Sequence, residues 1–192
     1  MHKIIEKAAR FMAIAGGCVL GALILITCLS VLGRSLNALL HGWVGQMMPG
    51  LSAWALDLGI GPVTGDFELV EAGVAFAVFA SLPLCQLRSG HASVDMFTHA
   101  LPQRARRFLA MVAEILFMLV LMLIAWRLFE GMLSKKSYGE TTFLLQLPIW
   151  WTYALSLIGA VMAAITAVYT AILRTAEFLL PYRIGIDEME WE

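Results

Sequence analysis

Four long, predominantly apolar stretches divide the 192-residue chain, and shorter polar segments separate them. The apolar stretches cover residues 11–33, 67–88, 108–127 and 149–173. Each has about the 20 residues that an α-helix needs to cross a hydrocarbon core of about 30 Å. The pattern therefore predicts an all-α integral membrane protein with four transmembrane helices, in a single membrane domain that comprises residues 1–192.

The second stretch has the most clearly marked ends. Three acids, Asp66, Glu68 and Glu71, stand at its start, residues 72–87 carry no charge, and Arg88 follows. Acids at the start and a base at the end agree with the dipole of a helix, and Asp66 is suited to be its N-cap. A helix of about 22 residues would measure about 33 Å, which is enough to cross the membrane.

Two connections between the stretches are expected to lie at the membrane surface. Residues 35–64 include Trp43 and Trp54 but only one charged residue, Asp57, and are therefore too apolar for a loop in water. Residues 94–101 form a second short segment with a helical pattern. We expect both to form interfacial amphipathic helices, with the Trp side chains at headgroup level. A cap that docks on a partner protein is an alternative for the first connection.

The basic residues predict the orientation of the chain. Four spans place both termini on the same side of the membrane. If that side is the cytoplasm, the inner segments carry nine of the 13 Lys and Arg residues and the outer segments carry four. The positive-inside rule then predicts a multi-pass protein with both termini in the cytoplasm. Glu68 and Glu71 would lie near the outer surface, and His91 and Asp95 near the inner surface.

The composition excludes other classes of protein. Apolar residues make up 60% of the chain and charged residues 14%, which is far from an ordinary soluble domain. The mean hydropathy is +0.82. A net charge of −1 gives no reason to expect a nucleic-acid partner. The three cysteines fall inside apolar spans without a CxxC pair, so we expect packing residues rather than redox or metal ligands.

The chain shows little sign of catalytic chemistry. The four histidines lie outside the clear spans, whereas haem ligands would face each other within them. The sequence contains no HExxH, P-loop or nucleophile-elbow motif. We therefore expect a protein that is not an enzyme and that has no catalytic, cofactor-binding, metal-binding or substrate-binding residue of its own.

The spans also offer few polar groups for a transport pathway. Glu114 is the acid that interrupts the third span, and it lies about 10 Å along the helix from Arg107, near the inner surface. It could bind hydrogen-bonding groups at that surface or contact another helix or subunit. Gln86 lies within one turn of Arg88 at the same end of the second span. These spans are typical of a scaffold.

Five segments near the ends of the spans are distinctive when taken together. They are Arg34, GDFELVE at 65–71, LPLCQLRSGHASVD at 82–95, ALPQRARR at 100–107 and GETTFLLQLPIWWTY at 139–153. The third contains a Gly-His-x-x-Val-Asp turn, and the last contains a Leu-Pro-x-Trp sequence. Together they resemble the small, four-helix DctQ-type membrane subunit of tripartite ATP-independent periplasmic (TRAP) transporters, over residues 11–173.

The resemblance implies a non-enzymatic role in the bacterial inner membrane. In that family, a periplasmic substrate-binding protein captures the substrate, usually a small carboxylate. A large membrane subunit holds the sodium and substrate sites and moves as an elevator, and the small subunit braces it. The resemblance thus implies no cofactor here, with sodium bound by the large subunit only. The partners would be that subunit, the periplasmic protein and the lipid bilayer, in a sodium symport system.

Residues at the ends of the spans are candidates for partner contacts or structural roles. They are Arg34, Glu68, Glu71, Gln86, His91, Asp95, Glu114, Pro148 and Trp150. Because the first two helices are antiparallel, we expect Arg34 to meet Glu68 or Glu71 at the outer surface. Two other functions stay open at this point: a small membrane redox or lipid enzyme subunit, and a self-sufficient small transporter.

Overall fold

The computed structural model describes residues 2–42, 50, 64–88 and 103–179. Four long helices account for most of them, and all four are long and apolar enough to cross a membrane. They are α1 (His2–His41), α4 (Asp66–Leu87), α6 (Gln103–Tyr138) and α7 (Trp150–Leu179). The described residues contain one isolated β-bridge, Thr141 with Pro148, and no strand. The predicted all-α architecture is confirmed.

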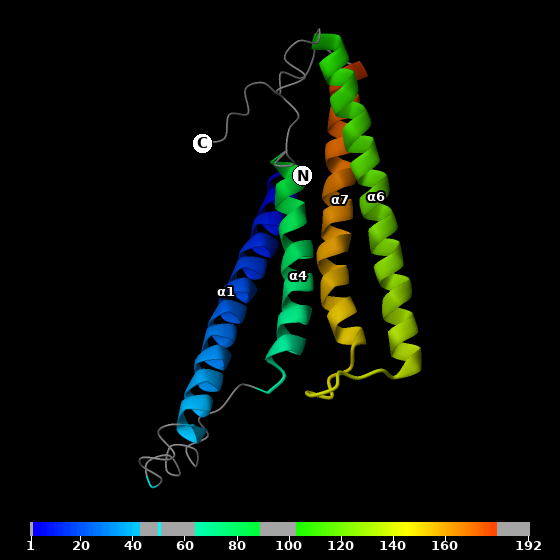
Figure 1. Cartoon of the computed structure of the whole chain (residues 1–192). Coiled ribbons are helices and arrows are strands. Elements are labelled where there is room, and N and C mark those ends of the chain that lie inside the picture. Colours follow the sequence, from blue (N-terminus) through cyan, green and yellow to red (C-terminus); the bar gives the residue numbers. More distant parts are fainter. Residues whose placement is uncertain (1, 43–49, 51–63, 89–102, 180–192) are drawn as a thin grey trace.

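The helices stand in a row in the order α1, α4, α7, α6 (Figure 1). Each packs on the next helix in the row, and α1 barely touches α7. Consecutive helices along the chain run in opposite directions (Figure 1). A hairpin at 139–149 joins α6 to α7, and we name this end of the row, where α4 also begins, the hairpin end. The other end, where α1 begins and α7 finishes, is the termini end.

The contact of α1 with α4 follows a seven-residue spacing. The buried residues of α1 are Ala9, Gly16, Leu23 and Ser30, which lie along one face of the helix. A Cβ atom at Gly16 would lie 3.1 Å from the Cβ of Ala80 in α4, so the absence of a side chain there allows close approach. Small residues at such contacts are typical of membrane helices, which pack by direct van der Waals contact.

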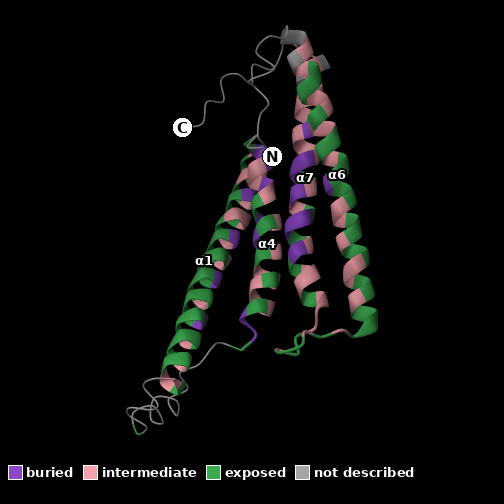
Figure 2. Ribbon diagram, viewed as in Figure 1, coloured by how far each residue is buried: buried purple, intermediate pink, exposed green. Residues whose placement is uncertain are grey.

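A stripe of small residues makes α7 the most buried of the four spans (Figure 2). Its buried positions include Ser156, Gly159, Ala160, Ala163, Thr166 and Ala167. A Cβ atom at Gly159 would come within 2.7 Å of the backbone carbonyl carbon of Phe79 in α4. The backbones of the two central helices therefore approach closely at this point, and the pairs α1–α4 and α6–α7 are joined there.

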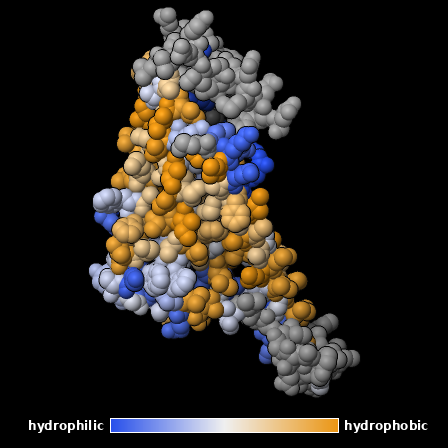
Figure 3. Space-filling view, turned by 180° about the vertical axis from the view of Figure 1, so that it is seen from behind, coloured by the Kyte–Doolittle hydropathy of each residue, from blue (hydrophilic) through white to orange (hydrophobic). Residues whose placement is uncertain are grey.

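Large apolar side chains cover the outside of the row. Examples are Leu25 on α1, Leu123 and Trp126 on α6, and Ile172 on α7, each more than half exposed. Figure 3 shows apolar residues over most of one face of the molecule. Such a surface would be unfavourable in water and suits contact with lipid or with another membrane protein.

Three helices are longer than the spans predicted from the sequence. α7 ends at Leu179 and not at residue 173. α1 takes in residues 2–10, which precede the first predicted span, and 35–41, which we had assigned to an interfacial segment. α6 continues past residue 127 to Tyr138. Charges mark where a span leaves the membrane, but they do not end a helix, because backbone hydrogen bonds continue in water and pairs such as Arg10–Glu6, at 2.9 Å, support it. Most of 35–64 and all of 94–101 lie outside the described residues.

Candidate functional site

Asp66 is the centre of a polar cluster where α4 begins beside α1. The residue is only 7% exposed. Its Oδ2 atom accepts a hydrogen bond from the Ser30 hydroxyl at 2.6 Å and one from the Arg34 guanidinium at 3.4 Å. Its Oδ1 atom accepts the backbone N–H of Phe67 at 2.9 Å. Ser30 and Arg34 are four residues apart and so share one face of α1, which lets both reach the same carboxylate.

Arg34 is held between this cluster and the surrounding medium. Its side chain is 54% exposed, and the guanidinium lies 5.6 Å from the centre of the Phe67 ring. We had expected Arg34 to meet Glu68 or Glu71, and the structure gives it a different acid, Asp66. The geometry still allows more contacts, because a guanidinium has five N–H donors and Asp66 takes one of them.

The start of α4 explains why Asp66 is the partner. The N-cap is Gly65 and not Asp66 as predicted, so Asp66 is the first helical residue. Gly65 has a φ of +82°, in the left-handed region that glycine adopts readily. A Cβ atom there would also lie 2.5 Å from Cγ of Leu145. The turn at Gly65 thus directs Asp66 towards α1 and leaves space for Leu145 of the hairpin.

Glu68 holds the hairpin against α4. Its Oε1 atom accepts the backbone N–H of Leu144 at 2.6 Å, and its Oε2 atom accepts that of Leu145 at 2.9 Å. We name this two-bond contact the Glu68 clamp. It joins the start of α4 to the connection between α6 and α7, and so links the two helix pairs at the hairpin end.

The remaining candidates at the hairpin end have simpler surroundings. Glu71 is exposed, and no hydrogen bond or ion pair reaches it from the described residues. Pro148 does not begin the last helix; it pairs with Thr141 in the hairpin, and α7 starts at Trp150. The ring of Trp150 lies 5.0 Å from that of Trp151 and 5.4 Å from the Lys136 ammonium.

A second polar cluster lies nearer the termini end and joins three helices. The side-chain amide of Gln86, in α4, donates to the Oε2 atom of Glu114, in α6, at 2.6 Å. The Thr170 hydroxyl, in α7, donates to the same oxygen at 3.0 Å, and the Gln86 amide also lies 3.3 Å from that hydroxyl. Gln86 is 1% exposed. Of the two roles considered for Glu114, the structure shows contacts with other helices of its own chain.

Other candidate sites offer little. His91 and Asp95 lie outside the described residues. Among the residues that are described, no group of three His, Cys, Asp or Glu could hold a metal ion. Cys18, Cys28 and Cys85, which all lie in the described helices, form no disulfide with one another.

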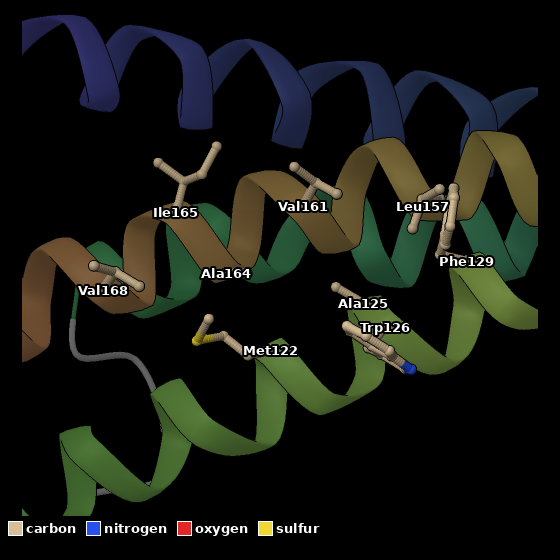
Figure 4. Close-up of a pocket in the computed structure, with 9 residues that line it drawn as sticks. All are labelled: Met122, Ala125, Trp126, Phe129, Leu157, Val161, Ala164, Ile165 and Val168. Carbon is tan, nitrogen blue, oxygen red and sulfur yellow. The ribbon is translucent and has the colours of Figure 1, made fainter.

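A groove of about 510 Å³ lies between α6 and α7 (Figure 4). α6 contributes Met122, Ala125, Trp126 and Phe129, and α7 contributes Leu157, Val161, Ala164, Ile165 and Val168. No charged residue lines this groove, and the only polar atom of its lining side chains is the indole nitrogen of Trp126, so the lining side chains offer no charge to pair with a carboxylate or a cation.

Both polar clusters lie within the part of the chain that matches a known family. A family model described as tripartite ATP-independent periplasmic transporters, DctQ component, matches residues 23–177. The chain belongs to the DctQ family. Comparison with curated proteins and with solved structures finds no match. The match includes all of α4 and α6 and nearly all of α7.

Membership of the DctQ family identifies the chain as a small membrane subunit of a TRAP transporter. The family is a transporter component and not an enzyme family. Four apolar helices fit a multi-pass protein of the inner membrane.

Three residues of the two polar clusters were not predicted as site residues from the sequence: Ser30, Asp66 and Thr170. Ser30 could have been found, because it continues the spacing of Ala9, Gly16 and Leu23 and so falls on the face that meets α4. Thr170 follows Thr166 by one turn, on a helix whose small residues recur at helical spacing. Asp66 was predicted only as the N-cap of the second span, an interpretation that gave no reason to expect its contact with α1.

Proposed function

We propose that this DctQ subunit is an accessory scaffold that braces the large membrane subunit of its transporter and does not itself hold the substrate. One observation carries the proposal. The buried side chains of Asp66 and Gln86 bond to other helices of the same chain, Asp66 to Ser30 and Gln86 to Glu114. A transport pathway requires polar groups that face a cavity. Here they act as cross-links between helices.

The single row of helices suits a bracing role. A row has two broad faces, and both α4 and α7 have a neighbour on each side in the row. One face can contact the large subunit while the other contacts lipid. Rigidity comes from the close approach at Gly159 and from the polar cross-links near both ends.

The substrate and the energy source are proposed from the family. The complex would import a small carboxylate together with sodium. A periplasmic substrate-binding protein would deliver the carboxylate, and the large subunit would bind both the carboxylate and sodium. Both termini of the DctQ subunit would lie in the cytoplasm, which places the hairpin end at the periplasmic surface. The ratio of nine to four basic residues supports this orientation.

Co-purification and transport in liposomes test the proposal together. The tagged DctQ chain is co-expressed with the large subunit, and the complex is purified in mild detergent. We expect the large subunit to co-purify. We also expect sodium-dependent uptake only from liposomes that contain both subunits, with the periplasmic protein supplied outside.

Other outcomes would favour the alternative functions. Uptake by the DctQ chain alone would contradict the proposal and indicate a self-sufficient transporter. A haem or quinone spectrum in the purified chain would indicate a redox subunit.

A further inference from the structure

The tip of the 139–149 hairpin exposes large apolar side chains at the end of the helix row. Phe143 is 90% exposed, Leu144 57% and Leu147 50%. No charged residue occurs from Thr141 to Leu173, so the side chains of the tip offer no charge for an ion pair, and its exposed polar residues are the uncharged Thr141 and Gln146. Three such residues on one short loop would be unfavourable in a purely aqueous position.

The hairpin has a defined shape that keeps these side chains outside. The backbone N–H of Thr142 donates to the carbonyl of Leu147 at 2.8 Å, and that of Ile149 donates to the carbonyl of Glu140 at 3.0 Å. The Glu68 clamp then fixes the tip to α4. Leu145 is half-buried and fills the space above Gly65, whereas its neighbours point away. The exposure of Phe143 therefore follows from a bonded structure.

The position of the hairpin identifies what covers it. It joins two helices that are long and apolar enough to cross a membrane, and it ends at residue 149, where the predicted span of α7 begins. Tyr138, Trp150 and Trp151 flank it, together with Lys136, whose ammonium lies over the Trp150 ring. Aromatic rings with Lys nearby are typical of the boundary between acyl chains and headgroups. The exposed apolar surface of α6 and α7 continues to this level, with Leu133 48% and Trp151 56% exposed.

We propose that the hairpin tip inserts Phe143, Leu144 and Leu147 into the lipid leaflet at the hairpin end of the row. The tip lies on the membrane, and its apolar side chains reach the boundary between headgroups and acyl chains. The lipid that surrounds α6 and α7 thus extends over the tip. The uncharged composition favours lipid over a water-soluble protein as the occupant. The inference depends on the membrane-spanning fold and not on the bracing role.

Site-specific photo-crosslinking tests this contact in native membranes. A benzophenone amino acid replaces Phe143, which has a similar ring, in a chain co-expressed with the large subunit. The control carries the same group at Ser137, an exposed polar position at the end of α6. After irradiation, we expect phospholipid adducts by mass spectrometry, at a yield several-fold higher at position 143 than at 137. A second variant with the group at Leu144 should behave like the first.

Two outcomes would overturn the inference. A protein adduct at position 143, visible as a large shift on a gel, would show that a protein covers the tip. Equal lipid yields at positions 143 and 137 would show that the tip is not inserted. Either result leaves the association of the DctQ chain with the large subunit measurable in the same membranes, so the proposed function is tested separately.

Discussion

Gln86 donates its side-chain amide to Glu114 over 2.6 Å, and this bond joins α4 to α6, which are not neighbours in the row. α7 lies between them and adds Thr170 to the same carboxylate. The oxygen Oε2 of Glu114 therefore accepts bonds from two helices. In a membrane interior, a polar group that loses its partner has no water to replace it.

We expect Gln86→Leu and Glu114→Leu each to destabilise the fold by about 1–3 kcal/mol, because each leaves a partner without its bond. The double variant should cost less than the sum, with a coupling of about 0.5–2 kcal/mol. Unfolding in detergent measures the stability of the native chain, the two single variants and the double variant. Glu130→Ala is the control, since Glu130 is exposed and pairs only with Arg127. Additive effects of the two substitutions would contradict the cross-link.

The two acids Asp66 and Glu71 should differ in what their removal does. Asp66→Ala leaves Ser30 and Arg34 without their shared acceptor and should cost about 1–3 kcal/mol of stability. Glu71→Ala should change the stability by less than about 0.5 kcal/mol, because substitutions of exposed residues usually have effects no larger than this. If Glu71 contacts the large subunit, this variant should weaken assembly without lowering the expression of the chain. Pull-down yields, normalised to expression, separate the two effects. A loss of stability in Glu71→Ala would contradict this assignment.

Arg34→Ala tests the exposed side of the same cluster. Its pair with Asp66 is half-exposed, so the loss of stability should be only about 0–1 kcal/mol. We expect assembly with the large subunit to decrease more than stability does. An unchanged yield of the complex in both Arg34→Ala and Glu71→Ala would mean that neither side chain contributes to assembly with the large subunit.

Hydrogen exchange can detect the Glu68 clamp directly. In Glu68→Ala, the backbone N–H groups of Leu144 and Leu145 lose their acceptor and should exchange on the order of tenfold faster. Exchange within α6 and α7 should not change. Glu68→Gln keeps one acceptor oxygen and should give an intermediate rate, and Glu71→Ala serves as the matched control. Unchanged exchange at the hairpin would show that the clamp does not hold it.

Substitution of glycines by alanine can distinguish helix faces that are packed from faces that are open. Gly159→Ala places a Cβ within 2.7 Å of the α4 backbone and should cost about 1–3 kcal/mol by forcing α4 and α7 apart. Gly21→Ala meets nothing within 4 Å, so the isolated chain should be as stable as before or slightly more stable. Melting temperatures of the two variants provide the comparison. A destabilised Gly21→Ala chain would point to a contact of α1 that the row of helices does not contain.

The sequence predicted the helices well where polar residues mark both ends of a span. The second span was expected at 67–88 and is Asp66–Leu87, and the fourth was expected from residue 149 and starts at Trp150. Both ends of α1 and α6, and the C-terminal end of α7, were predicted less well. Hydropathy reports where a helix leaves the membrane, and a helix can continue beyond that point with charged side chains in water.

The contacts between side chains could not be predicted at the same level. Successive residues of a helix point about 100° apart, so the three acids at the start of α4 face different neighbours. With Gly65 as the N-cap, Asp66 faces α1 and Glu68 faces the hairpin. The sequence supplied Arg34, Glu68, Gln86 and Glu114 as candidates, but their partners depend on which face of each helix meets its neighbour.

The orientation of the chain in the membrane is the last prediction. Thr64 and Ser137 are exposed residues at the hairpin end, and Lys3 and Arg88 are exposed residues at the termini end. If both termini are cytoplasmic, cysteines at Thr64 and Ser137 should react in intact cells with a reagent that cannot cross the inner membrane. Cysteines at Lys3 and Arg88 should react only after the cells are opened. The native chain is the blank, because Cys18, Cys28 and Cys85 lie within the spans. The reverse pattern would contradict the charge argument and place the Glu68 clamp and the hairpin tip in the cytoplasm. The periplasmic protein could then not reach either feature, and the lipid leaflet that receives Phe143 would be the inner one.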